Sequence, residues 1–380
     1  MSPAVLHCYA DYKWTGPSEP VALLCRELAR QGWRVELACA RARGGPGGSL
    51  AAEARKMGLT VHDGFSFSGG PGLSHSLKDI ERLSALLESG GFDMVHVHGS
   101  WDHVLAAAAM RRSPCRVPVV RTDHKGREYT GNVLERLQFS PRWSDHLLVL
   151  SDRLRARAID RLGLSPDKVT TVRGAVDLAR FCPVEAPRAV RARFGLSDSD
   201  IILLLVARIQ RHRHFDVLLE AAKRVRRSDP RVKIAVLGRG TRKAALLDRP
   251  VRKMGLHDTV CPLGYYAEGY RDILAMADAG LMLVPGSDGS CRAAMQLVAM
   301  GKPLVVSDRG VLPDIVSDGV TGIVTKDKPD LLAEGILEMA QSAPQRAEWG
   351  RAARQRMEVL FSLEGQAKSV VEVYRRLLGQ

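Results

Sequence analysis

The amino-acid sequence predicts an α/β protein built from two Rossmann-like domains. At 380 residues the chain is longer than one hydrophobic core usually supports, so two domains are expected. Short apolar, β-branched segments alternate with amphipathic segments, which indicates parallel sheets covered by helices on both faces. The pattern restarts near residue 200, and this restart indicates that the second domain repeats the architecture of the first.

The predicted strands form two series, and each strand is followed by a segment with helical spacing of apolar residues. The first series is Ala4–Tyr9, Arg34–Ala40, Thr60–Asp63, Met94–Val97, Pro118–Arg121, His146–Leu150 and Val169–Val172, and the second is Ile201–Val206, Val232–Leu237, Thr259–Pro262, Gly280–Val284, Pro303–Ser307 and Gly322–Val324.

The domain boundaries follow from these series. Gly174–Pro183, with the Pro-containing segment after it, is the expected hinge. We therefore expect an N-terminal domain over residues 1–178 and a C-terminal domain over residues 179–355. Residues 356–380 are expected to form a closing helical segment that packs back toward the N-terminal domain.

Charge and composition narrow the classes of partner. The net charge of +14 is spread over both halves, and aromatic residues are only 5% of the chain, so a nucleic-acid platform is not expected. The charge also fits an anionic membrane surface, with Arg111, Arg112, Arg153, Arg155 and Arg157 as candidate contacts, although solvated helix faces explain these arginines equally well. The longest apolar run is too short to span a bilayer and no secretory signal is evident, so a cytoplasmic protein, peripheral at most, is expected.

Candidate ligand contacts in the first half follow strand ends, because open parallel sheets bind ligands beyond the carboxyl ends of their strands. The loop after the first strand carries Lys13, Trp14 and Gly16 and leads into a helix whose first amides suit an anion. An ordinary strand-to-helix turn needs the same residues. His98, with Asp102 after it, and His124 end two later strands, and together they favour a polar cleft over two satisfied structural histidines.

Two loops of the second half suit a diphosphate. The loop Ala207–Asp216 is basic, and guanidinium groups pair with phosphate oxygens two at a time, although a solvated loop is the alternative. The loop Pro285–Cys291 exposes amides at a helix start. Asp288 and Gln296 are eight residues apart, about 12 Å along a helix, which suits the two ends of a nucleotide diphosphate sugar. The alternative is a capped helix start with a solvated Gln296.

Taken together, these segments resemble the family-4 retaining glycosyltransferases of the GT-B fold, over nearly the whole chain. Each segment alone is weak evidence for this family, whereas the segments together, in this order and spacing, are specific to it. The matching segments are Thr15–Pro17, Asp93–Gly99, His124, Gly174–Pro183, Arg208–Asp216, Gly238–Gly240, Leu263–Gly264, Pro285–Pro303 and Asp314–Gly322.

The resemblance implies a two-substrate reaction without a cofactor or metal. A nucleotide diphosphate sugar would bind the second domain, a glycan or glycolipid acceptor would bind the first, and transfer in the cleft would retain the anomeric configuration. Basic side chains and helix-start amides would take the place of a cation on the leaving diphosphate.

The resemblance also assigns roles to individual residues. His124 and Asp288 would be catalytic. Lys13, Trp14, His98 and Asp102 are the expected acceptor contacts. The donor contacts are expected at Gly16, Arg208, Arg213, Gly264, Tyr265, Asp288, Gly289, Ser290, Cys291 and Gln296.

The chain departs from the family pattern at the donor site. Two glutamates eight apart in the family are Asp288 and Gln296 here, and the family's phosphate-binding lysine is Arg213. A neutral amide forms hydrogen bonds roughly half as strong as those of a carboxylate. The leading interpretation is an active transferase that extends a cell-envelope acceptor. The alternatives are a weakly active or inactive relative that serves as a binding subunit, and a sugar-nucleotide epimerase.

Overall fold

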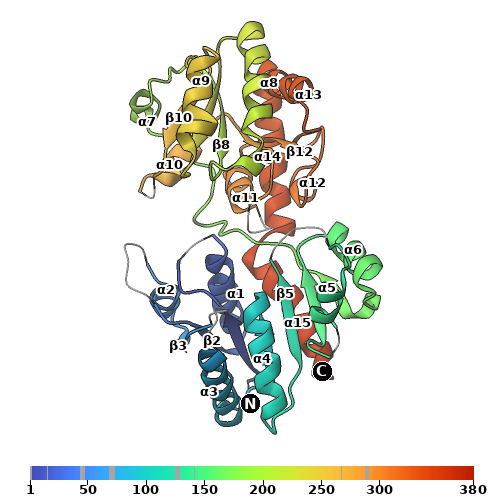
Figure 1. Cartoon of the computed structure of the whole chain (residues 1–380). Coiled ribbons are helices and arrows are strands. Elements are labelled where there is room, and N and C mark those ends of the chain that lie inside the picture. The colour runs from blue at the N-terminus through green and yellow to red at the C-terminus, as the bar shows by residue number, and fades with distance from the viewer. Residues whose placement is uncertain are drawn as a thin grey trace. The chain divides into compact units, whose positions relative to one another are not determined.

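The computed structural model describes residues 2–14, 16–42, 48–67, 73–124, 129–140, 142–266, 268–286 and 291–380. These residues form two compact units (Figure 1). Unit 1 contains Met1–Ala175 and Leu363–Gln380, and unit 2 contains Val176–Gly286 and Cys291–Ser362. The last helix of the chain therefore belongs to the same unit as the first strand.

Unit 1 is built on a seven-stranded sheet in which all the paired strands are parallel. The strand order is β3-β2-β1-β4-β5-β6-β7, so the direction of strand addition reverses between β1 and β4. The strands are β1 (Ala4–Tyr9), β2 (Arg34–Ala40), β3 (Thr60–Phe65), β4 (Met94–Val97), β5 (Val119–Asp123), β6 (His146–Val149) and β7 (Val169–Thr171).

Two apolar clusters cover the two faces of this sheet. Successive side chains of a strand point to opposite faces, so Val5 and Leu6 join different clusters. The cluster around Val5 includes Val21 of α1 and Val370 of α15, whereas Leu105 of α4 belongs to the cluster around Leu6. The helices of unit 1 are α1 (Ser18–Arg30), α2 (Leu50–Lys56), α3 (Leu73–Gly90), α4 (Ser100–Arg112), α5 (Val133–Gln138), α6 (Asp152–Leu162) and α15 (Leu363–Leu377).

Unit 2 repeats this topology with a six-stranded parallel sheet of order β10-β9-β8-β11-β12-β13. The reversal lies between β8 and β11. The strands are β8 (Ile201–Val206), β9 (Val232–Leu237), β10 (Val260–Gly264), β11 (Ala279–Met282), β12 (Leu304–Ser307) and β13 (Gly322–Thr325). The helices are α7 (Arg188–Arg193), α8 (Phe215–Ser228), α9 (Arg249–Lys253), α10 (Tyr270–Ala275), α11 (Arg292–Ala299), α12 (Leu312–Ile315), α13 (Pro329–Gln341) and α14 (Ala343–Leu360).

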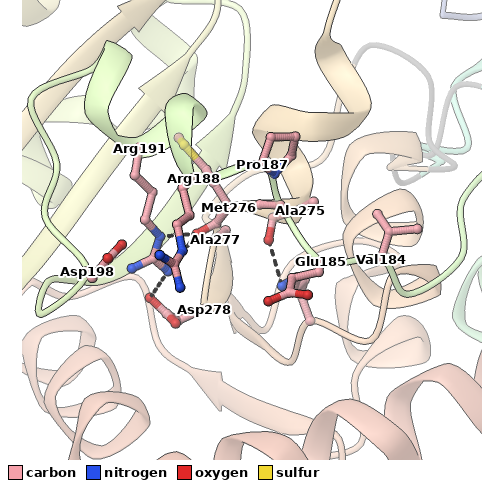
Figure 2. A pocket seen from close by; sticks show the side chains of 12 residues that line it. Val184, Glu185, Pro187, Arg188, Arg191, Asp198, Ala275, Met276, Ala277 and Asp278 are labelled. Atoms are coloured by element: carbon pink, nitrogen blue, oxygen red, sulfur yellow. Dashed lines mark hydrogen bonds and ion pairs between the residues drawn. The ribbon is translucent and has the colours of Figure 1, made fainter.

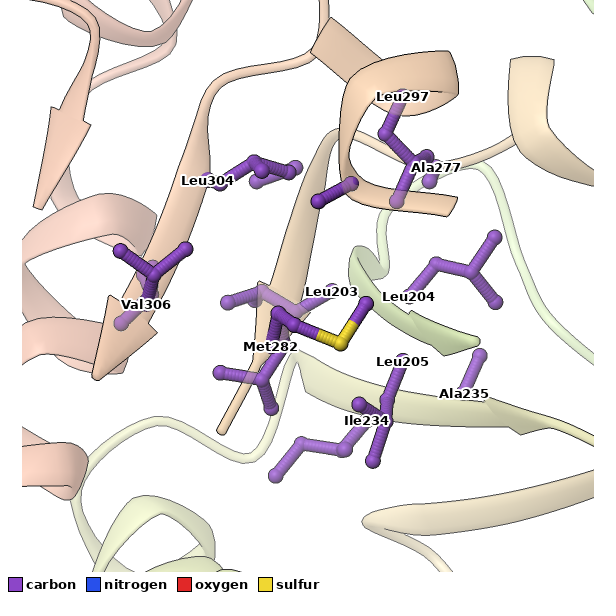
Figure 3. Packing of buried hydrophobic residues seen from close by; sticks show 14 of the residues in the cluster. Leu203, Leu204, Leu205, Ile234, Ala235, Ala277, Met282, Leu297, Leu304 and Val306 are labelled. Atoms are coloured by element: carbon purple, nitrogen blue, oxygen red, sulfur yellow. The ribbon is translucent and has the colours of Figure 1, made fainter. Parts of the chain in front are cut away.

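The core of unit 2 explains why its central strands are apolar throughout. Leu203, Leu204 and Leu205 of β8 are all buried, because helices cover both faces of the sheet. Figure 3 shows these leucines among Ile234 of β9 and Met282 of β11. The two predicted Rossmann-like folds are confirmed, and they bring the loops that follow β8 and β11 to one edge of the sheet.

Candidate functional site

The loop after β8 packs against the loop after β9 because Gly238 and Gly240 leave room for it. The amide of Ala207 donates to the carbonyl of Leu237 at 3.1 Å, and the amide of Ile209 donates to that of Arg239 at 3.0 Å. A Cβ atom on Gly238 would lie 1.9 Å from the carbonyl oxygen of Ala207. Any larger residue at position 238 would therefore push the basic loop away from its neighbour.

Arg213 ties the basic loop to the end of β11. Its side chain is 6% exposed, and its Nη1 donates to the carbonyl oxygens of Val284 at 2.9 Å and Pro285 at 2.5 Å. The guanidinium charge is thus held between the two loops that flank the strand-order reversal. Arg208, five residues earlier, is exposed.

His214 fixes the start of α8. It adopts the left-handed conformation, with φ at 56°, and its Nδ1 pairs with the carboxylate of Asp327, which follows β13. Arg309 contacts the same carboxylate at 2.8 Å. Asp327 therefore anchors the basic loop through a second contact, in addition to the carbonyl partners of Arg213.

The end of β10 presents an aromatic ring. Gly264 has a φ of 90°, which favours glycine, and its carbonyl accepts the amide of Gly238 at 2.7 Å. Tyr265 follows with 55% of its surface exposed, and the guanidinium of Arg239 lies 4.5 Å from its ring centroid. An exposed ring with a cation on it suits stacking against a flat ligand.

The loop before α11 is described only at its ends. Asp288, Gly289 and Ser290 lie outside the described residues. Cys291, the N-cap residue, is buried and adopts a φ of 51°, a conformation uncommon outside glycine.

Gln296 is buried rather than solvated. Its side chain is 4% exposed, and its Oε1 accepts a hydrogen bond of 2.8 Å from the hydroxyl of Tyr270 in α10. The solvated alternative for Gln296 is therefore wrong. Because the amide oxygen accepts from the tyrosine, the amide nitrogen is the donating end of this side chain.

On unit 1, Lys13 and Trp14 border a short antiparallel contact. Lys13 bridges to Ser49, and the amide of Trp14 donates to the carbonyl of Gly48 at 3.0 Å. The side chain of Lys13 is exposed and Gly16 is half-buried just before α1. The contacts of these residues with an acceptor or donor stay predictions.

Asp102 caps the start of α4. It is fully buried, and its Oδ2 accepts from the amides of His98 at 2.9 Å and Gly99 at 2.8 Å. Burial raises the pKa of this carboxyl, and the backbone amides oppose the rise. This contact holds the chain at the point where β4 ends, so Asp102 positions His98, and its predicted contact with an acceptor stays a prediction.

His98 and His124 are brought together by the fold. His98 Nδ1 and His124 Nε2 are 3.0 Å apart at the ends of β4 and β5. His7 Nδ1 lies 2.8 Å from His98 Nε2, and His96 stacks on His98 with ring centroids 4.2 Å apart. Sequence reasoning missed His7 and His96 as members of this group. The signal it passed over is a histidine at an inward strand position between apolar residues.

Among the described residues, His7, His96 and His98 form the group of ring nitrogens that lie close enough together, within 4.8 Å of one another, to hold a metal ion. In the part of the chain that the structure describes, no helix is both long and apolar enough to cross a membrane.

A separate pocket of about 370 Å³ lies at the amino ends of the unit 2 strands (Figure 2). Two of its cations, Arg191 and Lys302, contact the protein itself. Arg191 donates to the carbonyl of Met276 at 2.9 Å and contacts Asp278 at 3.1 Å, and Lys302 donates to the carbonyl of Ala275 at 2.8 Å. The pocket is therefore stabilised by one ion pair and by hydrogen bonds to backbone carbonyls, and it lies at the end of the sheet opposite the candidate donor loops.

Two family descriptions match the chain. Glycosyltransferase Family 4 matches residues 16–180, and Glycosyl transferases group 1 matches residues 188–356. The matches adjoin along the chain and cover most of both units.

Curated relatives and solved structures agree with these matches. D-inositol 3-phosphate glycosyltransferase of Thermobifida fusca is 32% identical over 62% of this chain and 58% of its own length, so the match spans less than two thirds of that relative. The enzyme of the same name from Frankia alni is 29% identical over 79% of this chain and 78% of its own length. A glycosyltransferase of Rickettsia africae has a TM-score of 0.84 at 16% identity, covering 99% of each chain. Anabaena HepE, solved with UDP, has a TM-score of 0.77 at 15% identity, covering 99% of this chain and 100% of its own.

Proposed function

The chain belongs to the group 1 glycosyltransferases with the GT-B fold, and from this premise we propose that it is a retaining, metal-independent hexosyltransferase. It moves a sugar from a nucleotide diphosphate sugar to a glycan, a glycolipid or another cell-envelope acceptor.

The observation that carries the proposal is the set of loops at the carboxyl edge of the unit 2 sheet. Arg213 is held between the loops after β8 and β11, and these strands flank the reversal where open α/β sheets bind their ligands. A buried, permanently charged guanidinium supports binding of a diphosphate. Exposed Arg208 supplies a second cation from the same loop.

The remaining donor contacts follow the order of a nucleotide sugar. Tyr265 and the backbone at Gly264 meet the base, and Gln296 meets the ribose through its amide nitrogen. Asp288 holds the hydroxyls of the transferred sugar, and the residues Gly289, Ser290 and Cys291 offer backbone amides beside the diphosphate.

On unit 1, His124 lies beside the reacting sugar and Gly16 borders the donor phosphates and acceptor. Lys13, Trp14, His98 and Asp102 form the acceptor side, the last two by shaping the strand end. The leaving group of the reaction is a diphosphate, so the main task of the site is to stabilise negative charge on it. Fixed positive charges and aligned amides stabilise the charge that develops on it as the bond from the anomeric carbon to the phosphate oxygen breaks, without a metal ion.

The direct test is donor binding and hydrolysis by the purified full-length chain. UDP-glucose is the first donor to assay, because Anabaena HepE was solved with UDP and glucose. GDP-, ADP- and TDP-sugars complete the panel, and D-inositol 3-phosphate joins the acceptors because it appears in the names of relatives. Binding followed by acceptor-dependent release of the nucleotide, unchanged by a chelator, is expected. The absence of binding to every donor at millimolar concentration would overturn the proposal.

A second function, that of a weakly active or inactive binding subunit, is favoured by one observation. Gln296 replaces the family's second glutamate, and its oxygen is already occupied by Tyr270. The double variant Asp288→Glu, Gln296→Glu separates the two functions. An active enzyme adapted to its own donor loses activity in this variant, whereas a decayed enzyme gains it.

A sugar-nucleotide epimerase is the third alternative. An epimerase needs no acceptor, so the products formed from the donor alone identify it. Formation of the epimeric nucleotide sugar in that reaction would replace the transferase assignment.

We further propose that the protein acts in the cytoplasm, attached peripherally to the anionic inner face of the cytoplasmic membrane. Three apolar side chains of α5 face solvent: Val133 is 72% exposed, Leu134 is 78% exposed and Leu137 is 57% exposed. The net charge of +14 adds attraction to anionic lipid.

Three of the arginines predicted as lipid contacts interact with other groups of the protein. The guanidinium of Arg111 lies 4.4 Å from the ring of Trp143, and Arg112 lies 3.5 Å from Glu81. Arg155 donates to the carbonyls of Val169 and Pro166. The apolar face of α5 therefore carries more of this proposal than those arginines do.

Vesicle co-sedimentation tests the attachment. The double variant Val133→Ser, Leu134→Ser should lose binding to phosphatidylglycerol vesicles at low salt. The matched control is Leu77→Ser, which removes an exposed leucine of α3 and should bind as the unmodified protein does. Equal binding by all three proteins, or no binding by any, would exclude α5 as the attachment site.

A further inference from the structure

One row of hydrogen bonds runs through unit 1 beneath α15. It joins β1, β4, β5 and α15 to the ring of His124, and five of its six side chains are buried. We call these six residues the histidine row. In order, the contacts are Thr122 Oγ1 to His96 Nε2 at 2.7 Å, His96 Nδ1 to Tyr374 Oη, Tyr374 Oη to His7 Nε2 at 3.4 Å, His7 Nδ1 to His98 Nε2 at 2.8 Å, and His98 Nδ1 to His124 Nε2 at 3.0 Å.

Strand register explains why the rings meet. His7 of β1 is the register partner of His96 of β4, and His98 is two residues further along the chain, so all three rings lie on one face of the sheet. That face is otherwise apolar and is covered by α15, which contributes Tyr374. Buried polar rings in such a place are costly unless they are hydrogen-bonded, and the row supplies those bonds.

The buried rings are neutral. Burial lowers the pKa of His7 to about 3, and it lowers the pKa values of His96 and His98 well below the usual value. A neutral imidazole has one N–H that donates and one bare nitrogen that accepts. Each contact in the row needs one donor and one acceptor, so the choice made at one ring dictates the choice at the next. When the single hydroxyl proton of Tyr374 is donated within the row, two complete arrangements exist: all four histidines protonated on Nε2, or all four protonated on Nδ1.

Tyr374 selects between these two arrangements. A phenol is a stronger hydrogen-bond donor than a neutral imidazole, and the hydroxyl lies closer to His96 Nδ1 than to His7 Nε2. The hydroxyl therefore donates to His96 and accepts from His7 Nε2–H. Continued along the row, this direction makes His98 donate to His7 and His124 donate to His98.

We propose that the histidine row holds His124 as its Nε2–H tautomer, which makes Nδ1 the accepting nitrogen of this ring. His7, His96, His98 and Tyr374 are positioning residues in this arrangement. The tautomer follows from the row alone, and its effect on sugar transfer rests on the proposed function.

The spacing of the rings argues against a metal ion in the same place. Two imidazole nitrogens bound to one zinc ion at about 2.0–2.1 Å in tetrahedral geometry lie about 3.3 Å apart. His7 Nδ1 and His98 Nε2 lie 2.8 Å apart, which is a hydrogen-bond length. This pair therefore shares a proton rather than a metal.

Long-range ¹H–¹⁵N correlation spectra of the full chain labelled with ¹⁵N-histidine measure the tautomers directly. Such spectra distinguish a protonated ring nitrogen from a bare one, and single His→Gln variants assign the signals. All four histidines should be Nε2–H at neutral pH. A mixture of tautomers among the four, or Nδ1–H at His124, would overturn the proposal. No substrate is present, so this result is independent of whether the protein transfers a sugar.

Two variants test the coupling along the row. Tyr374→Phe keeps the ring that packs 5.1 Å from Trp33 and removes the hydroxyl. Thr122→Val removes the acceptor at the far end. In both variants the His124 signals should move toward the Nδ1–H position, although the neighbour of His124 in the row is His98 and not either substituted residue. Because the spectrum of the unmodified protein already decides between the arrangements, the proposal stays testable if Tyr374→Phe does not fold.

The matched control is Thr170→Val. Thr170 Oγ1 bonds His146 Nε2 at 2.8 Å on the neighbouring strands β6 and β7, outside the row. This variant should change the signals of His146 and leave those of His124 in place. Unchanged His124 signals in both Tyr374→Phe and Thr122→Val would refute the coupling. A stoichiometric shift of His7, His96 and His98 on adding zinc, reversed by a chelator, would identify a metal site instead.

Activity provides a second readout where a donor and acceptor are known. Tyr374→Phe removes one hydrogen bond that helps to fix the His124 tautomer. It should therefore lower kcat roughly 5-fold and leave the KM for the donor unchanged. Failure of all transfer in the unmodified protein would refute the proposed function and leave the tautomer result standing.

Discussion

Replacing Arg213 with alanine separates a structural arginine from one that also binds the donor. Its Nη1 donates to two backbone carbonyls, those of Val284 and Pro285, at the base of the loop before α11. The same group is the proposed contact for the donor diphosphate. Arg213→Ala therefore removes two backbone contacts and a buried charge in one step.

The magnitude follows from the partners. A hydrogen bond to a charged group contributes about 1.5–3 kcal/mol, and two bonds from one nitrogen do not add fully, so a loss of about 2–4 kcal/mol in the free energy of unfolding is expected. The loss of one charge-assisted contact with the diphosphate should raise the Kd of the donor roughly 10- to 100-fold. Arg213→Lys keeps the charge and should therefore lose less stability and less donor affinity than Arg213→Ala.

Arg346 provides the matched control. Its Nη1 also donates to two consecutive carbonyls, those of Met339 and Ala340, at 3.1 and 2.9 Å, between α13 and α14. Urea unfolding should show destabilisation in both Arg213→Ala and Arg346→Ala. Calorimetric titration at a temperature where both are folded should show weakened donor binding only in Arg213→Ala. Donor binding of equal strength in the two variants would mean that Arg213 is structural alone.

Three further predictions concern stability. Gly238→Ala should lower the free energy of unfolding in urea by about 1–3 kcal/mol, because its Cβ would lie 1.9 Å from the Ala207 carbonyl oxygen. The control Gly64→Ala should be near neutral, because only the tip of Arg82 lies within 4.0 Å of its Cβ. Asp102→Ala should lower the free energy of unfolding by about 1–3 kcal/mol, because the buried amides of His98 and Gly99 lose their acceptor. Asp102→Asn should cost less because its amide oxygen still accepts. Equal losses of stability in the two variants would contradict this reasoning. Stability should fall as the pH drops from about 6.5 toward 4, by up to about 1.4 kcal/mol per pH unit for each buried histidine, because the unfolded chain binds protons that the folded chain excludes. Burial lowers the pKa of His7 to about 3 and those of His103 and His146 to about 4, and a flat urea midpoint between pH 7 and pH 5 would refute this sign.

The sheets were predictable because their strands carry a local signal. Ala4–Tyr9, Met94–Val97 and Ile201–Val206 begin and end where the pattern of apolar, β-branched residues predicts. Buried parallel strands are apolar along their whole length, and this requirement is visible in a single sequence. The predicted ends of β5 and β10 are less accurate, because Asp123 and Gly264 extend those strands with residues that strand propensity disfavours.

The donor loops were predictable as positions but not as contacts. The topology places Arg208, Arg213 and Gly264 at one edge of the unit 2 sheet, as the strand pattern predicts. The burial of Gln296 was not predicted, because it depends on the hydroxyl of Tyr270, which lies 26 residues earlier on another helix. Such a partner is chosen by the tertiary structure, and no local pattern marks it.

The histidine row shows the same limit more sharply. His96 and Tyr374 are separated by 278 residues, and only the return of α15 to unit 1 brings them together. Taken singly, His7 and His96 are unremarkable polar residues in apolar strands. Their chemistry exists only as a row, because the tautomer of each ring depends on its neighbours.

The two units use one topology for opposite electrostatic purposes. At the reversal of unit 2, Arg213 holds a permanent charge, which suits the proposed diphosphate. At the reversal of unit 1, His7 and His98 are buried deeply enough to stay neutral. A charged imidazole there would donate from both nitrogens and break the direction of the row, so burial protects the acceptor nitrogen of His124. The burial of the histidine rings is therefore a requirement of the row. A variant that admits water to these rings should lose the common tautomer before it loses the fold.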